Sequence, residues 1–284
     1  MLKKNKKGDK VVVNRFKDYF KKVKKALVKV EMGMLPASLA FNFMLAIIPI
    51  LTLTVLIASS FNISIDNVTK LIGNVLPQES SKVVIDIISG KGFDNTVGIF
   101  NIVAFIIATN GTYAIVKAAN TLYGIKKSDA FKDRIKSIII LLAIIVLLIF
   151  MILVPMFGDK ILEVLRNNTV LENIIDEVII LFKIIKWPIT FLILLFNIKL
   201  IYTIAPSKNV KSENTTYGAL TTTILWMIFT VVFGYYLKYF ARYDILYGNL
   251  SSIIILMIFL YMISYVFVLG MVINTTKYEK EEDL

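Results

Sequence analysis

Hydrophobic residues are grouped along the chain in long runs rather than in short alternating patterns. A helix needs about 20 apolar residues to cross the hydrocarbon core of a bilayer. Six runs meet that length, and they predict membrane spans at about 36–59, 95–116, 137–157, 184–204, 215–237 and 250–273. Continuous runs favour helices over the strands of a membrane barrel, because a helix satisfies its own backbone N–H and C=O groups where water is absent. The sequence therefore predicts an all-α, polytopic membrane protein with six transmembrane helices.

The composition agrees with a chain that lies in lipid. Of the 284 residues, 57% are hydrophobic and only 18% are charged, and the mean hydropathy is +0.74. Six buried helices of this kind would leave too little chain to cover them in a soluble protein, so that class is excluded. The fourth run is the least apolar, because it contains Lys186 and Lys199. Both lie close enough to its ends for their ammonium groups to reach the headgroups.

Lys and Arg residues alternate in density from one connection to the next. The arm 1–36 and the segments 119–136, 205–215 and 275–284 together hold twenty-one of them, whereas the alternate connections hold eight. Lys and Arg are retained on the cytoplasmic side of a membrane. The sequence therefore predicts that both termini are cytoplasmic and that 36–274 forms the transmembrane domain.

The arm, residues 1–35, combines apolar and basic positions. Its apolar residues recur at helical spacing, at Val13, Phe16, Phe20, Val23, Leu27 and Val30. Lysines lie among them, at Lys21, Lys22, Lys24, Lys25 and Lys29. This pattern predicts an N-terminal amphipathic helix on the bilayer surface, where each lysine contributes about 1 kcal/mol of attraction to anionic lipid headgroups. No nucleic acid partner is expected, because residues 1–10 carry no aromatic side chain on which bases could stack.

Two residue types that are common in catalytic sites are absent. The sequence has no His and no Cys, which excludes imidazole catalysis, thiolate chemistry and disulfides. Asp129, Asp133 and Asp244 are interpreted as loop charges rather than metal ligands, since no ligand-like spacing surrounds them. No Gly-rich phosphate loop is present either. We therefore expect no metal, no cofactor and no enzymatic activity.

Polar residues within the spans are the candidates for function, because a polar group in hydrocarbon is costly unless it is paired or faces a cavity. The candidates for a cavity or pathway lining are the polar or helix-loosening residues of spans one, two and four, namely Asn42, Pro49, Asn101, Asn110, Gly111, Thr112 and Lys199. Asn197 is a further polar residue of span four. The alternative is that these residues hold helices together, and that Lys117 and Lys199 only extend to the membrane surface.

The outer connections contain two further candidate features. Tyr243, Tyr247 and Gly248 lie in a tyrosine-rich segment after span five and could form an outer mouth, or an aromatic belt at the interface. The segments 66–89 and 161–182 carry apolar stripes that predict additional amphipathic helix on the outer surface.

Short motifs occur along the chain in a defined order. They are Leu39 to Pro49, Ala119 to Gly124 with Phe131 and Arg134, Tyr202 with Pro206, Gly218 with Ala219 and Trp226, Tyr243 with Tyr247 and Gly248, and Leu269 to Asn274. This ordered set, over about residues 20–277, resembles the YihY/virulence factor BrkB family of bacterial inner-membrane proteins. The resemblance implies six helices in a bacterial cytoplasmic membrane. The chain departs from the family pattern at Asn42, Ala46 and Val272, the last of which replaces an acidic residue.

Three functions follow from these observations. The first is a transporter or exporter of a small or lipid-like molecule, which alternately exposes a polar seam between helices to the two sides. The second is a membrane protein that organises the envelope without transport. The third is ribonuclease activity, an old association of the family, which is disfavoured because the chain has no His and its spans contain no Asp or Glu. A transporter predicts a hydrated cavity between the polar residues of the spans, a structural protein predicts a dry, filled bundle, and a ribonuclease predicts a cluster of carboxylates.

Overall fold

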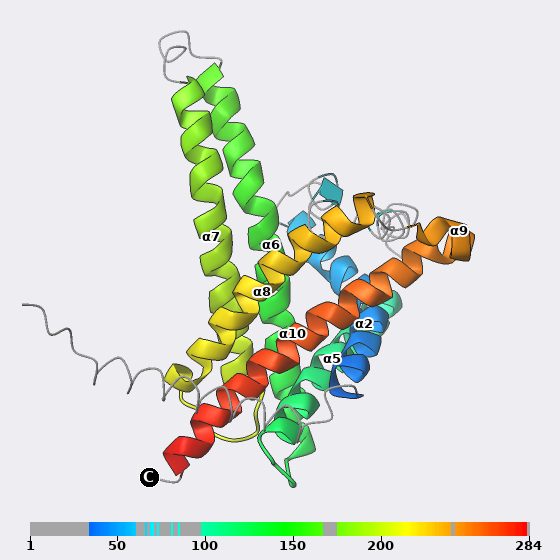
Figure 1. The fold of residues 1–284 in the computed structure, drawn as a ribbon, viewed down its shortest axis with the longest axis vertical. Coiled ribbons are helices and arrows are strands. Elements are labelled where there is room, and N and C mark those ends of the chain that lie inside the picture. Colours follow the sequence, from blue (N-terminus) through cyan, green and yellow to red (C-terminus); the bar gives the residue numbers. More distant parts are fainter. Residues whose placement is uncertain are drawn as a thin grey trace, which may run out of the picture.

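The structure, a computed structural model, describes residues 34–60, 98–166, 175–239 and 242–282, together with six single positions between 66 and 85. All regular elements in these residues are helical (Figure 1). They are α2 (Met34–Ser60), α5 (Gly98–Leu122), α6 (Ala130–Arg166), α7 (Ile175–Ile204), α8 (Ser212–Tyr239), α9 (Tyr243–Tyr247), the 3₁₀ turn η3 (Gly248–Leu250) and α10 (Ser251–Glu282). Six of them are long and apolar enough to cross a membrane, which confirms the predicted all-α, six-span class. The predicted amphipathic helix of the arm, with its five lysines, lies outside the described residues.

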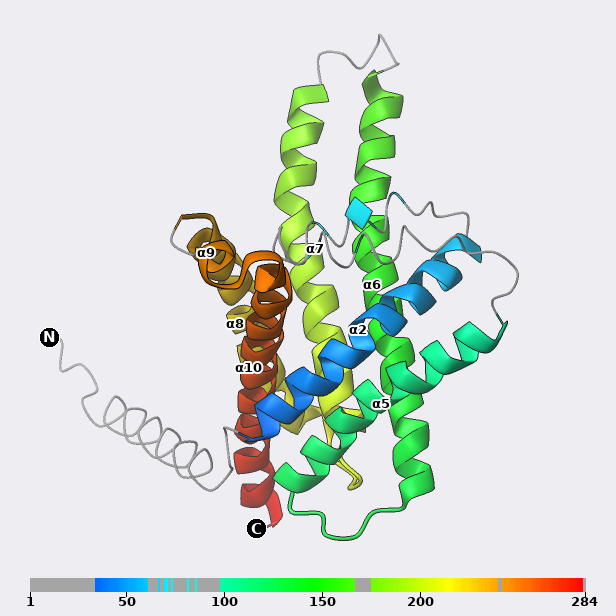
Figure 2. The same ribbon diagram turned by 90° about the vertical axis from the view of Figure 1, so that its right-hand side faces the viewer.

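Helices α6 and α7 extend beyond the predicted spans. The sequence predicts span three to end near residue 157 and a separate amphipathic helix at 161–182, but α6 continues to Arg166 and α7 already begins at Ile175. At about 1.5 Å per residue, the 37 residues of α6 span roughly 55 Å, against about 30 Å of hydrocarbon. The apolar stripe of the outer segment thus prolongs the two spans, and the resulting hairpin stands clear of the other helices (Figures 1 and 2).

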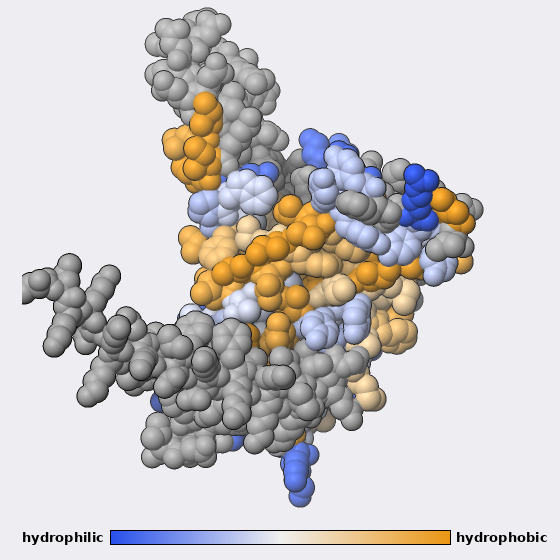
Figure 3. All heavy atoms as spheres, in the orientation of Figure 1, coloured by the Kyte–Doolittle hydropathy of each residue, from blue (hydrophilic) through white to orange (hydrophobic). Residues whose placement is uncertain are grey.

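Each long helix packs against its neighbours in a closed series: α2 against α5, α5 against α6, α6 against α7, α7 against α8, α8 against α10, and α10 against α2 (Figure 2). The main core cluster draws Leu39, Ile115, Ile140, Tyr202 and Met271 from five different helices. Outside this core many large apolar side chains are exposed. On the face seen in Figure 3 they form a band over α8 and α10. Such a surface is costly in water and matches the hydrocarbon of a bilayer.

Two connections and one helix end lie together at one end of the bundle. They are the α5–α6 connection, the α7–α8 connection and the end of α10, whereas the end of α6 and the start of α7 lie at the opposite end (Figures 1 and 2). Lys126 and Lys127 occupy the first of these connections, and Lys208 and Lys211 occupy the second. We refer to this end as the basic end of the molecule.

Candidate functional site

A cleft of about 470 Å³ opens between α2, α5 and the first turns of α6, near the basic end. Its lining residues are Leu35, Ser38, Leu39 and Asn42 from α2, Asn110, Tyr113, Ala114, Lys117, Ala118 and Thr121 from α5, and Arg134 from α6. The spacings of three and four along α2 and α5 place these side chains on one face of each helix. We call this opening the α2–α5 cleft.

A close contact between α2 and α5 lies directly beyond the cleft. A Cβ atom added at Gly111 would lie 2.4 Å from Cβ of Ala46, so only glycine allows the two helices to approach this closely. Thr112, which is fully buried, donates a hydrogen bond of 2.8 Å to the carbonyl of Ser137 and so ties α5 to α6. Gly111 and Thr112 therefore lie at helix contacts rather than on the cleft.

Two cationic side chains of the cleft meet at one aromatic ring. Nζ of Lys117 lies 4.8 Å from the ring centroid of Tyr113, and the guanidinium carbon of Arg134 lies 5.0 Å from the same centroid. Arg134 also donates a hydrogen bond of 2.9 Å to Oδ1 of Asn110. None of the lining residues is an Asp or Glu. The cleft therefore carries two positive charges without a lining carboxylate to neutralise them.

The other predicted pathway residues are placed as follows. Asn42 lines the cleft and donates to the carbonyl of Ser38 at 2.8 Å. Pro49 lies within α2, which continues through it. Lys199 is partly buried on α7 and is not part of the cleft lining. The side chain of Asn101 lies outside the described residues. Of the seven predicted residues, the cleft thus brings together Asn42 and Asn110.

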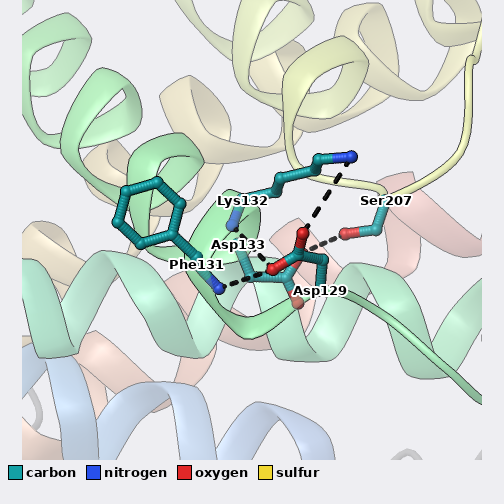
Figure 4. Close-up of polar contacts among 5 residues, drawn as sticks. All are labelled: Asp129, Phe131, Lys132, Asp133 and Ser207. Carbon is teal, nitrogen blue, oxygen red and sulfur yellow. Dashed lines mark hydrogen bonds and ion pairs between the residues drawn. The ribbon is translucent and has the colours of Figure 1, made fainter.

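A buried polar network joins the two basic connections. The side-chain amide of Asn120 donates to Oδ2 of Asp133 and to Oγ of Ser207, both at 3.1 Å, and its Oδ1 accepts from the backbone N–H of Ser207 at 2.7 Å. The hydroxyl of Ser207 donates to Asp133 (Figure 4), and Lys136 donates to the carbonyl of Pro206. We call Asn120, Asp133 and Ser207 the polar latch.

The latch corrects the sequence interpretation of one acid, Asp133. Asp133, expected to be a loop charge, is only 2% exposed, because Asn120 and Ser207 satisfy its carboxylate. Asp129 caps the start of α6 by accepting from the N–H of Phe131 at 2.9 Å and forms an exposed ion pair of 3.9 Å with Lys132 (Figure 4). The side chain of Asp244 lies outside the described residues. No group of three or more metal-binding side chains occurs within the described part of the chain.

Helices α8 and α10 cross through two glycines. A Cβ atom at Gly270 would lie 2.0 Å from Oγ1 of Thr222 and 2.4 Å from the hydroxyl of Tyr202. That Tyr202 hydroxyl lies 2.7 Å from Oγ1 of Thr222 and donates to the carbonyl of Phe267, also at 2.7 Å. Oδ1 of Asn274 accepts from the N–H of Gly218 at 2.8 Å. The sequence motifs include Tyr202, Gly218, Gly270 and Asn274 but do not assign them to a helix crossing, and they do not include Thr222 or Phe267.

The predicted outer-mouth residues form the turn between α8 and α10. The rings of Tyr243 and Tyr247 stack in α9 with centroids 6.4 Å apart, and Gly248 follows with φ +50°. A hydrogen bond with Tyr236, and then partial burial, raise the pKa of Tyr243 above its ordinary value. The positive φ of Gly248 is a left-handed backbone conformation that favours glycine. Space is not the reason for glycine there, because an added Cβ atom would meet nothing within 4 Å.

The sequence profile of the virulence factor BrkB family matches residues 25–283 of the chain. The protein belongs to this family. A relative in Bacillus subtilis (strain 168), YfkH, is 29% identical over 251 residues, which cover 87% of this chain and 90% of the relative. Its name describes it as ribonuclease-like without assigning an activity. The resemblance to the BrkB family inferred from the sequence motifs is thus confirmed, and the chain is an integral membrane protein.

Shorter matches connect this BrkB-family chain to a second group of membrane proteins. A UPF0761 membrane protein of Coxiella burnetii (strain Dugway 5J108-111) is 37% identical over 71 residues, 25% of this chain and 26% of that protein. A UPF0761 membrane protein of Tolumonas auensis (strain DSM 9187 / NBRC 110442 / TA 4) is 38% identical over 80 residues, 28% of this chain and 26% of that protein. No solved structure matches the chain.

Proposed function

We propose that this protein is a transporter or exporter of a small or lipid-like molecule in the bacterial cytoplasmic membrane, with both termini in the cytoplasm. The observation that carries the proposal is the α2–α5 cleft, where polar and charged side chains lie between spans that are otherwise apolar. The two lining cations without a lining carboxylate support a ligand-binding role for this opening rather than a purely structural one.

The orientation is supported by the position of the basic residues. The α5–α6 and α7–α8 connections carry Lys126, Lys127, Lys208 and Lys211 and lie at the same end as the end of α10. Retention of Lys and Arg in the cytoplasm then places this end, and the α2–α5 cleft near it, on the cytoplasmic side. A ligand would enter the cleft from the cytoplasm or from the inner leaflet.

We further propose that the protein is not an enzyme. A ribonuclease needs an acid and a base, or carboxylates that hold metal ions, within reach of one phosphodiester. The chain has no His. Asp133 is enclosed by Asn120 and Ser207, and the α2–α5 cleft presents cations without a carboxylate. Such a surface can bind an anion, but it has no carboxylate or imidazole that could act as a general base.

The α6–α7 hairpin favours a second function, the organisation of the envelope. Helix α6 is about 25 Å longer than the hydrocarbon core requires. With the basic end in the cytoplasm, the tip of this hairpin would project from the outer face, where it could contact another envelope component. This role is compatible with transport, and the labelling experiment below separates the two.

Labelling of single cysteines tests the proposal, because the chain has no native cysteine. Ala114→Cys places a thiol in the α2–α5 cleft, and Ala219→Cys, in the buried core, is the matched control. Lys126→Cys and Arg166→Cys mark the two ends of the bundle. Each variant would be treated with a membrane-impermeant maleimide in right-side-out and in inside-out vesicles.

Transport by alternating exposure predicts that Ala114→Cys reacts from both sides, that Ala219→Cys reacts from neither, and that Lys126→Cys reacts from the cytoplasmic side alone. Reaction of Ala114→Cys from the cytoplasmic side alone would refute alternation at this site and leave the envelope-organising function. Reaction of Lys126→Cys from the outside would reverse the proposed orientation.

A further inference from the structure

We infer that the α2–α5 cleft binds a phosphate group, and specifically the phosphate of an anionic phospholipid in the inner leaflet. This inference rests on the proposed function and names the class of molecule that the site would take. The ligands of the phosphate are the ammonium of Lys117 and the guanidinium of Arg134, which approach the same ring of Tyr113.

Charge is the first reason for an anionic ligand. Lys117 and Arg134 are both lining residues, and no Asp or Glu lines the cleft with them. The neighbouring acid, Asp133, is turned to Asn120 and Ser207 and is almost fully buried there. Asp129 pairs with Lys132 at the exposed start of α6. The two cations of the cleft therefore keep their charge available for a ligand.

Contacts within the cleft orient both cations before a ligand arrives. Arg134 is held by its hydrogen bond to Asn110 and by the ring of Tyr113, and Lys117 is held by the same ring. A guanidinium has five N–H donors, so the bond to Asn110 leaves donors for a phosphate oxygen. Holding both cations in place lowers the entropy that is lost on binding.

The depth of the cleft matches the phosphate layer of a membrane. Lys117 lies five residues before the end of the span Ile102–Leu122, and Arg134 lies four residues after the start of the span Ala130–Met151. At about 1.5 Å per residue, both lie within roughly 8 Å of the helix ends. That is the depth of the headgroup region rather than of the bilayer centre.

An apolar surface continues from the cleft toward the bilayer centre. One turn beyond Asn110 on the same face of α5 lies Ile106, which is 51% exposed, and a further turn on lies Ile102, which is 62% exposed. Leu45 follows Asn42 on α2 and is 55% exposed. A ligand with a phosphate at one end and acyl chains at the other would satisfy both parts of this surface, whereas free phosphate would use only the cationic part.

A fluorescent reporter inside the cleft tests the inference and avoids confusion with lipid bound at the basic arm. Ser38→Cys, at the rim of the cleft, would carry an environment-sensitive dye in the full-length protein in neutral detergent. The dye signal would be titrated with short-chain phosphatidylglycerol, with phosphatidylcholine and with inorganic phosphate. The charge-removing variant is Lys117→Gln/Arg134→Gln. The matched control is Lys126→Gln/Lys127→Gln, which removes the same charge from the adjacent connection.

We expect saturable binding of phosphatidylglycerol that weakens at least about tenfold in Lys117→Gln/Arg134→Gln and changes less than about twofold in the control, since charge-assisted hydrogen bonds carry the binding. Phosphatidylcholine is expected to bind much more weakly. Equal binding of the two lipids, or equal loss in both double variants, would overturn the inference. If inorganic phosphate binds as tightly as phosphatidylglycerol, the inference that the bound phosphate group belongs to a lipid is overturned, and the ligand of the cleft is free phosphate.

The folded state of the double variant is checked separately. If Lys117→Gln/Arg134→Gln aggregates, two single variants take its place. Lys117→Gln is expected to weaken the binding of phosphatidylglycerol, whereas the charge-preserving Lys117→Arg is expected to retain it. This titration measures binding alone. A failure here therefore leaves the alternating exposure of Ala114→Cys standing, and a failure of alternation leaves a static lipid site standing.

Discussion

The crossing of α8 and α10 should tolerate no side chain at Gly270. In Gly270→Ala the new methyl would lie 2.0 Å from Oγ1 of Thr222 and 2.4 Å from the hydroxyl of Tyr202, far inside van der Waals contact. These two oxygen atoms cannot both move aside, because the Tyr202 hydroxyl also donates to the carbonyl of Phe267 in a fully buried environment. The two helices must therefore separate or the Tyr202 hydrogen bonds must break.

The magnitude of the effect follows from these two costs. Forcing one methyl into a packed interior costs about 1–3 kcal/mol. An interhelical hydrogen bond within a membrane protein contributes about 0.6 kcal/mol on average, and Tyr202 makes two, with Thr222 and with Phe267. Together they predict that Gly270→Ala lowers the free energy of unfolding by about 2–4 kcal/mol.

The assay is unfolding by SDS in mixed micelles, followed by far-ultraviolet circular dichroism and by the fluorescence of Trp226. This residue reports on the same crossing, because its indole N–H donates to the carbonyl of Ile263 at 2.9 Å. A Trp187→Phe background removes the second indole. The matched control is Gly234→Ala on α8, where a Cβ atom meets nothing within 4 Å; it should be neutral or stabilising by up to about 1 kcal/mol.

An unfolding curve of Gly270→Ala that coincides with that of the parent protein would refute the predicted clash. Relief of the nearest contact gives a second check. Adding Thr222→Ala to Gly270→Ala removes the atom at 2.0 Å, so the double variant should regain part of the lost stability. If the two substitutions are simply additive, the contact with Thr222 is not the cause.

Three further substitutions test other parts of the structure. Asp133→Ala should destabilise the protein by about 1–3 kcal/mol because it removes one of the two acceptors of the buried Asn120 amide and the acceptor of the Ser207 hydroxyl, and Asp133→Asn should cost less; chemical denaturation compares them. Thr112→Val should lose about 1 kcal/mol with its bond to Ser137, and an unchanged denaturation midpoint would contradict this. Gly248→Ala should cost about 1–2 kcal/mol through backbone strain alone, so a larger loss would indicate a contact absent from the structure.

The spans could be predicted from the sequence because each is set by local composition. The uncharged run 36–59 falls within α2, and 215–237 falls within α8. A helix in lipid satisfies its own backbone, so its existence does not depend on which helix packs beside it. The same reasoning fails at the end of span three. Hydropathy marks where the chain leaves the hydrocarbon, but α6 continues for as long as its backbone stays helical.

The site could be predicted only in part, because its partners are distant in sequence. Asn120 and Ser207 are 87 residues apart, and no local pattern indicates that they share a hydrogen bond with Asp133. Gly111 illustrates a second limit. A glycine that loosens a helix and a glycine that lets a neighbour approach look the same in sequence, and only the contact with Ala46 decides between them. Arg134 was counted as a loop charge, although it completes the α2–α5 cleft.

The polar latch has a mechanical consequence for the bundle. Asp133 and Arg134 are adjacent near the start of α6. Asp133 accepts a hydrogen bond from Ser207 in the α7–α8 connection, whereas Arg134 lines the α2–α5 cleft. Any shift of this part of α6 that widens the cleft therefore pulls on Ser207, which lies five residues before the start of α8. The first turns of α6 thus couple the α2–α5 cleft to the α7–α8 connection.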